Sequence, residues 1–129
     1  MNITNEYEVR VTEQESLYKN TTPNGDFTQP NLSDLIQLIE VWGAEKGLLD
    51  NNKKLTQLAK LFEEGGELAS GILKDDKVLQ KDSIGDCVVV LTLLARQLGF
   101  TLEECIREAY IEIKDRTGTI SKDGSFIKD

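Results

Sequence analysis

The 129-residue sequence predicts an all-α fold, a four-helix bundle with a short C-terminal hairpin and an extended N-terminal arm. Three observations predict this fold. Apolar residues recur at helical spacing in four segments, the connections between these segments are short, and glycines or capping residues lie at the expected helix ends. We therefore divide the chain into an arm, residues 1–30, and a helical domain with its hairpin tail, residues 31–129.

The arm is polar and is interrupted by two prolines. Apolar and charged residues alternate over residues 7–11, which indicates one short strand at most. Ser33 is the expected N-cap of the first helix, and the glycines around Lys46 predict that this helix ends there. Trp42 is in phase with the apolar residues of this helix, which favours a place in the core over a role in stacking on a nucleobase.

A second helix is expected from about Lys53 to Leu73 and a third from about Asp76 to Leu98. Gly65 and Gly66, in the middle of the second helix, cost roughly 1–2 kcal/mol in helix propensity against two alanines. Close helix packing or the approach of a ligand should compensate for this cost. The third helix is apolar nearly all round over residues 87–95, which predicts a central buried helix.

This apolar surface exceeds the need of one small bundle, so we expect a homo-oligomer, a dimer or a tetramer, built through helices. The two cysteines, Cys87 and Cys105, are in apolar phase and are expected to be buried thiols. A capping box over residues 101–104 opens a fourth helix, whose apolar side chains, Ile106 and Tyr110 among them, should face inward. The Asp-Gly pair at residues 123–124 favours a hairpin in the tail.

Charge and composition narrow the function. The formal net charge is −8, and half of it lies in residues 63–86, which hold seven acidic and three basic residues. A chain of this charge is a poor binder of nucleic acid polymers. Histidine is absent, which excludes histidine acid–base catalysis and His-containing zinc sites. No apolar run is long enough to span a membrane and no secretory signal is visible, so we expect a cytoplasmic protein.

Five carboxylates form the candidate site. Glu63, Glu64 and Glu67 project within about one turn of the second helix, and Asp82 and Asp86 lie one turn apart on the third. If the two helices are antiparallel neighbours, these acidic turns can face each other. Oxygen ligands select hard cations, so Mg²⁺ or Mn²⁺ is the expected metal. The alternative is that the glutamates form only a solvated helix face.

The motifs Glu63-Glu-Gly-Gly-Glu67 and Lys81-Asp-Ser-Ile-Gly-Asp86 resemble those of the MazG-like members of the all-α NTP pyrophosphohydrolase superfamily, which include small proteins of phages and Gram-positive bacteria. The resemblance extends from about Leu35 to the C-terminus and includes the tail. Ser83 stands where the second motif of the family has glutamate, and Asp82 is the residue that could supply the missing carboxylate.

The resemblance implies Mg²⁺-dependent hydrolysis of a nucleoside triphosphate to the monophosphate and pyrophosphate, a house-cleaning activity on the nucleotide pool. Glu63 or Glu64 would orient the attacking water or accept its proton. The substrate-binding candidates are the basic tail residues, which could neutralise pyrophosphate, and the aromatic residue that could stack on a base: Lys114, Arg116, Lys122 and Trp42. The alternative for the first two cations is that they favour the dipole at a helix C-terminus.

Two rival functions remain open. The fold could serve as a non-catalytic helical oligomerisation or interaction module, an alternative motivated by Ser83 and by the unmatched arm. The enzyme could instead act on a phosphoribosylated nucleotide, as phosphoribosyl-ATP pyrophosphatases do, although the shortage of basic residues before the tail argues against this substrate.

Overall fold

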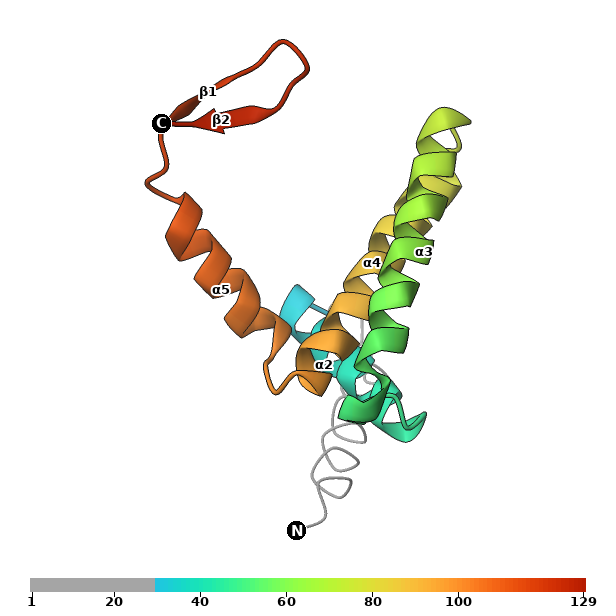
Figure 1. The fold of residues 1–129 in the computed structure, drawn as a ribbon. Coiled ribbons are helices and arrows are strands. Elements are labelled where there is room, and N and C mark those ends of the chain that lie inside the picture. Colours follow the sequence, from blue (N-terminus) through green and yellow to red (C-terminus); the bar gives the residue numbers. More distant parts are fainter. Residues whose placement is uncertain (1–29) are drawn as a thin grey trace, which may run out of the picture.

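The structure is a computed structural model and describes residues 30–129; residues 1–29 of the expected arm, with its expected strand, lie outside the described residues. Figure 1 shows the arrangement of the elements in this part of the chain. They are α2 (Leu32–Glu45), a 3₁₀ turn η1 (Asn51–Lys53), α3 (Lys54–Leu73), α4 (Lys77–Gln97), α5 (Leu102–Ile113), β1 (Gly118–Ile120) and β2 (Phe126–Lys128). The prediction of an all-α fold with a C-terminal hairpin is confirmed.

Side-chain caps set the helix starts. Asn31 accepts a hydrogen bond from the backbone N–H of Asp34 at 2.8 Å, and the Asp34 carboxylate accepts one from the N–H of Asn31 at 3.1 Å. The expected N-cap at Ser33 is therefore wrong, because this capping box begins the helix two residues earlier. The capping box of α5, from Thr101 to Glu104, is confirmed.

Helices α3 and α4 form an antiparallel pair that dominates the fold (Figure 1). Their backbones approach closely at Gly71, where an added Cβ would lie 3.1 Å from the backbone nitrogen of Gln80. An added Cβ at Gly65 or Gly66 would meet nothing within 4 Å. Close packing among the described residues thus does not compensate for this glycine pair, and the approach of a ligand stays a prediction.

The core lies where α4 contacts α2, α3 and α5. Gly43 of α2 permits close contact with Leu93, because an added Cβ would overlap that side chain. A buried carboxylate, Glu40, forms an ion pair with Arg96 at 3.3 Å in the same region. Within residues 30–129 the buried apolar side chains are Ile36, Val41, Val90, Leu93, Ala95 and Leu102. The prediction that α4 is the central helix is thereby confirmed for its C-terminal half.

The fourth helix departs from the expected bundle. Helix α5 is bent by 101° from α4. Together with the hairpin it forms a C-terminal arm, called the arm from here on, that leads away from the α3–α4 pair (Figure 1). Ile106 and Tyr110 are 51% and 61% exposed, so the expectation that this apolar face points inward is wrong within one chain. Cys105, at the start of α5, is exposed rather than buried. Within residues 30–129, α5 therefore has no neighbouring element along most of its length.

The C-terminal hairpin is as expected. Strands β1 and β2 pair antiparallel with Gly118 opposite Lys128, and Gly124 has a φ of 88° in the connecting turn, which favours glycine.

Among the described helices, no single one is long and apolar enough to cross a bilayer. Helices α4 and α5 taken together are long and apolar enough, although they are bent by 101° relative to each other.

Candidate metal centre

Helices α3 and α4 bring together three carboxylates, Glu64, Glu67 and Asp86. One oxygen atom from each lies within 4.8 Å of the others. The antiparallel register explains this convergence: Gly71 lies against Gln80, so the turns that precede Gly71 on α3 lie beside the turns that follow Gln80 on α4. The expectation that acidic turns of the two helices face each other is met by these three residues.

The electrostatics of this carboxylate triad favour a cation. One carboxyl oxygen of Glu64, Oε2, is buried and has no hydrogen-bond partner among the described residues. Desolvation by burial raises the pKa of Glu64 above its ordinary value, and the negative charges of Glu67 and Asp86 raise it further. The group thus has an unsatisfied oxygen and an excess of negative charge, which a divalent cation would neutralise.

The spacing of the triad suits a small divalent ion. In an octahedral Mg²⁺ site, neighbouring ligand oxygens are about 3.0 Å apart and opposite ones about 4.2 Å, because each Mg–O distance is about 2.1 Å. The oxygens of the triad lie within 4.8 Å of one another, so binding of the ion would draw them closer together. An all-oxygen ligand set matches Mg²⁺ and Mn²⁺. The residues present therefore fit the expected metal.

The other two expected ligands lie outside the triad. Glu63 is exposed and its Oε2 is 3.0 Å from the Nζ of Lys60, an interaction that raises the pKa of that lysine. Asp82 is exposed and lines a shallow pocket with Lys77 and Lys81. For Glu63, the helical rotation of about 100° per residue explains the separation from Glu64, since adjacent positions on α3 point in different directions.

Ser83, at the position where the resemblance expects glutamate, is fully buried. Its hydroxyl has no hydrogen-bond partner in the part of the chain that the structure describes. It contributes no carboxylate, so α4 supplies the triad with Asp86 alone.

The basic candidates of the tail lie elsewhere. The Nζ of Lys114 is 2.9 Å from the carboxylate of Asp115, and the guanidinium of Arg116 is 2.6 Å from that of Glu112. Lys122 is exposed in the hairpin loop. All three belong to the arm that leads away from α3 and α4 (Figure 1), so one chain does not bring them to the triad.

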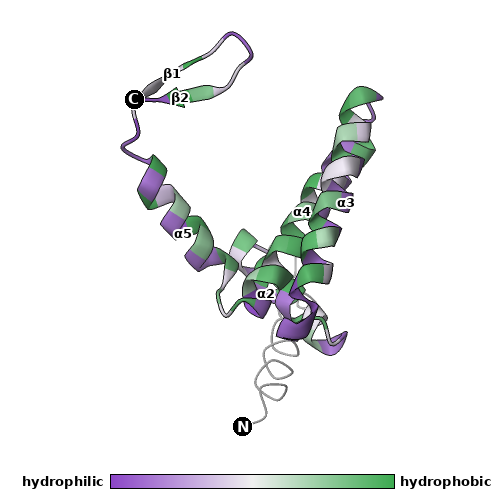
Figure 2. Ribbon diagram, viewed as in Figure 1, coloured by the Kyte–Doolittle hydropathy of each residue, from purple (hydrophilic) through white to green (hydrophobic). Residues whose placement is uncertain are grey.

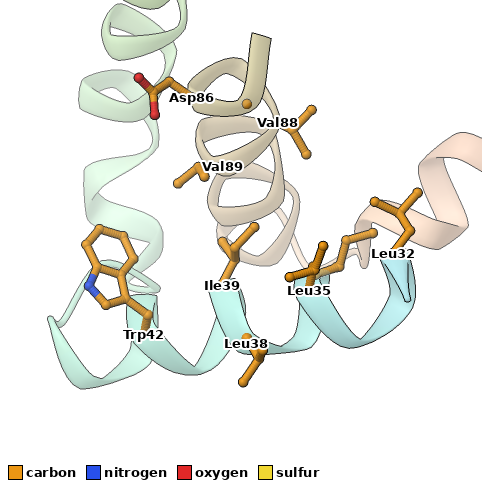
Figure 3. A pocket seen from close by; sticks show the side chains of 10 residues that line it. Leu32, Leu35, Leu38, Ile39, Trp42, Asp86, Val88 and Val89 are labelled. Atoms are coloured by element: carbon orange, nitrogen blue, oxygen red, sulfur yellow. The ribbon is translucent and has the colours of Figure 1, made fainter. Parts of the chain in front are cut away.

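An apolar groove of about 740 Å³ lies between α2 and α4, with Asp86 at one end (Figure 3). Trp42 is 44% exposed and lines this groove, so its expected place in the core is wrong, and its role as a base-stacking residue stays a prediction. Sequence reasoning did not locate the groove. The apolar surface around α4 indicated that part of this helix lacks a neighbour, but the sequence pattern does not show which side of the helix is exposed.

Fold and site together define a helical protein with an acidic candidate metal centre. Among curated proteins, the chain is similar to one described as an uncharacterized 18.2 kDa protein in the rep-hol intergenic region of Haemophilus phage HP1 (strain HP1c1). The two are 45% identical over 67 residues, which are 52% of this chain and 41% of the phage protein. The match thus spans less than half of that relative. The phage source is compatible with the expected likeness to small phage proteins.

No protein-family model matches the chain. No solved structure matches it either.

Proposed function

We propose that the protein is a cytoplasmic, Mg²⁺-dependent nucleoside triphosphate pyrophosphohydrolase of the MazG-like type, which releases pyrophosphate and a nucleoside monophosphate. The observation that carries the proposal is the convergence of Glu64, Glu67 and Asp86, with one buried and unpartnered oxygen on Glu64. These three positions, together with Glu63, are the acidic positions at which the sequence resembles the family motifs.

The proposed roles follow from the geometry of α3 and α4. Glu64, Glu67 and Asp86 would hold the cation, which when bound would screen the phosphate charges and acidify a water molecule. Glu63 lies next to the triad on α3, and its carboxylate is outside the proposed ligand set. It is the residue that could orient the attacking water and accept its proton. Its Oε2 is 3.0 Å from the Nζ of Lys60.

The direct test is a panel of ribo- and deoxyribonucleoside triphosphates with Mg²⁺ or Mn²⁺, in which pyrophosphate and orthophosphate are measured separately. We expect pyrophosphate and the monophosphate in equal amounts from at least one nucleotide, and no reaction with EDTA. Orthophosphate as the first product would contradict the cleavage position.

The alternative is a non-catalytic helical interaction module. The buried Ser83 favours it, because α4 then supplies the site with one carboxylate where the family motif has two. This alternative predicts that no nucleotide is hydrolysed.

Metal binding can be tested without turnover. If the triad holds a cation, Mg²⁺ should stabilise the fold by about 2.7 kcal/mol at a free concentration 100 times its Kd, which thermal melting detects as a higher Tm. The module without a metal site predicts equal Tm values with Mg²⁺ and with EDTA. A Tm increase without hydrolysis would keep the metal centre and overturn the enzyme.

A further inference from the structure

A fully buried hydroxyl group in α4 lacks a hydrogen-bond partner. Ser83 is 0% exposed, and its Oγ bonds to nothing among residues 30–129. Thr92 of the same helix is equally buried, but its Oγ1 donates to the carbonyl oxygen of Val88 at 2.7 Å, a usual bond of a buried hydroxyl in a helix. Buried polar atoms without a partner are rare and destabilising, so the hydroxyl of Ser83 indicates a bound species.

The register of α3 and α4 puts Ser83 beside the carboxylate triad. Asp86 meets Glu64 across the two helices. Glu67 follows Glu64 by three residues on α3, whereas Ser83 precedes Asp86 by three residues on α4. Because the helices are antiparallel, both steps lead about 4.5 Å in the same direction along the pair. Ser83 therefore lies at the level of Glu67, on the face of α4 that carries Asp86.

The surroundings of Ser83 and of the triad share one need. Hydrophobic residues recur along both α3 and α4, and they offer no hydrogen bonds through their side chains (Figure 2). A second buried oxygen without a partner in the described chain, Oε2 of Glu64, belongs to the triad itself. Two unpartnered buried oxygens on facing helices, beside two further carboxylates, favour a hydrated cation as the species that satisfies both.

We propose that Ser83 holds a water molecule that is itself a ligand of the cation bound by the triad. A serine oxygen is two bonds closer to the backbone than a glutamate oxygen, a difference of about 2.5 Å. A water molecule at hydrogen-bond distance, about 2.8 Å, spans that difference, so its oxygen takes the place of the carboxylate oxygen that a glutamate would supply here. Mg²⁺ keeps several water ligands, and such a water donates a hydrogen bond to the Ser83 hydroxyl.

Ser83 is then a positioning residue, which acts on the metal centre through a water molecule. This role rests on the cation of the proposed function, but it requires neither a nucleotide nor hydrolysis. The hydroxyl stabilises the loaded centre and destabilises the empty one, because only the loaded centre gives it a partner. A residue with a packing role alone would affect both states equally, so the two roles are distinguishable.

The test is isothermal titration of the full chain with Mg²⁺ and, separately, with Mn²⁺, together with thermal melting in EDTA. Ser83→Ala should raise the Kd for both ions by about 10- to 100-fold, whereas its Tm in EDTA should equal or exceed that of the wild type. Ser33→Ala is the matched control, because Ser33 is exposed in the first turn of α2 and lies outside the triad. It should keep the wild-type Kd.

Ser83→Glu replaces the proposed water with a carboxylate. Its Tm in EDTA should fall below that of the wild type, because a fourth negative charge joins the triad. Its Kd for Mg²⁺ should be equal to or lower than the wild-type value, because the new carboxylate would bind the ion directly. Ser83→Ala decides alone if Ser83→Glu does not fold.

Three results would overturn the role of Ser83: an unchanged Kd in Ser83→Ala, a loss of Tm in that variant that is equal with EDTA and with Mg²⁺, or weaker binding by Ser83→Glu than by Ser83→Ala. Pyrophosphate release is measured separately on the same proteins. Metal binding that depends on Ser83 without hydrolysis would overturn only the proposed enzyme, and hydrolysis with an unchanged Kd in Ser83→Ala would overturn only the role of Ser83. A wild-type chain that binds neither ion would overturn both.

Discussion

Charged side chains are arranged differently in two regions of the molecule, the α3–α4 pair and the arm formed by α5 and the hairpin. On α3 and α4, carboxylates from two helices are held within 4.8 Å of one another, and one of their oxygens is buried without a partner. On the arm, two of the three cations that sequence analysis assigned to the substrate have an opposite charge nearby: Arg116 is paired with Glu112, and Lys114 with Asp115. The first arrangement is unfavourable without a cation, whereas the second needs no ligand.

This difference separates a candidate site from an ordinary surface. Ion pairs on an exposed surface contribute roughly 0–1 kcal/mol and occur in proteins of every function. Like charges brought together by the fold destabilise it, and such groups occur preferentially at functional sites. The triad therefore carries the functional inference, and the arm does so only if a second copy brings its cations to the triad.

The largest expected effect comes from neutralising the triad. Glu64→Gln and Asp86→Asn each replace a ligand oxygen with an amide nitrogen or a neutral oxygen, which weakens the metal site. We expect each variant to lose at least about 100-fold in pyrophosphate release while the helical circular dichroism spectrum is unchanged.

Glu45→Gln is the matched control for the substitution type, because Glu45 is exposed at the end of α2 and lies outside the triad. It should retain wild-type turnover. Full activity in both triad variants would contradict the proposed role of the triad, because the converging carboxylates would then have no role in the reaction.

A smaller effect is expected on stability as the pH changes. Burial and the neighbouring carboxylates raise the pKa of Glu64 above 4.5 in the folded chain. The folded state therefore favours the protonated form, so the stabilising contribution is fully present below pH 4.5 and is lost as the pH rises through the raised pKa. With EDTA, the Tm of the wild type should fall relative to that of Glu64→Gln between about pH 4 and pH 7.

The difference in Tm between the wild type and the Glu64→Gln variant reports the contribution of Glu64. Burial also raises the pKa of Glu40, but this residue is present in both proteins and its contribution cancels. Parallel curves of Tm against pH would show that the fold places no excess charge at Glu64, and the comparison of the two regions would lose its electrostatic basis.

The helices were predictable because periodicity and capping act locally. The expected second helix from Lys53 to Leu73 is α3, from Lys54 to Leu73, and the capping box at Thr101 begins α5. The meeting of Glu64 with Asp86 followed from antiparallel neighbours. Which glutamate of an adjacent pair faces α4 depends on the rotation of α3 about its axis, and helical spacing does not specify that rotation.

The burial of apolar residues was less predictable for a related reason. Trp42 and Tyr110 lie on apolar stripes, and a stripe shows only that something covers it. The sequence pattern is the same whether the cover is another helix of the same chain or a second copy. Both residues are exposed in the fold of one chain, so the helices described here do not supply the cover that the stripes indicate.

The smallest effect is expected on the arm. Arg116→Gln removes the pair with Glu112, which is exposed, so the free energy of unfolding should change by less than about 1 kcal/mol. Because one chain does not bring Arg116 to the triad, pyrophosphate release at saturating substrate should stay within about threefold of the wild type, a barrier difference of about 0.7 kcal/mol. Steady-state kinetics and thermal melting measure the two quantities. A loss of tenfold or more without a change in Tm would place the arm of a neighbouring copy at the triad, and the two regions would then be parts of one shared site.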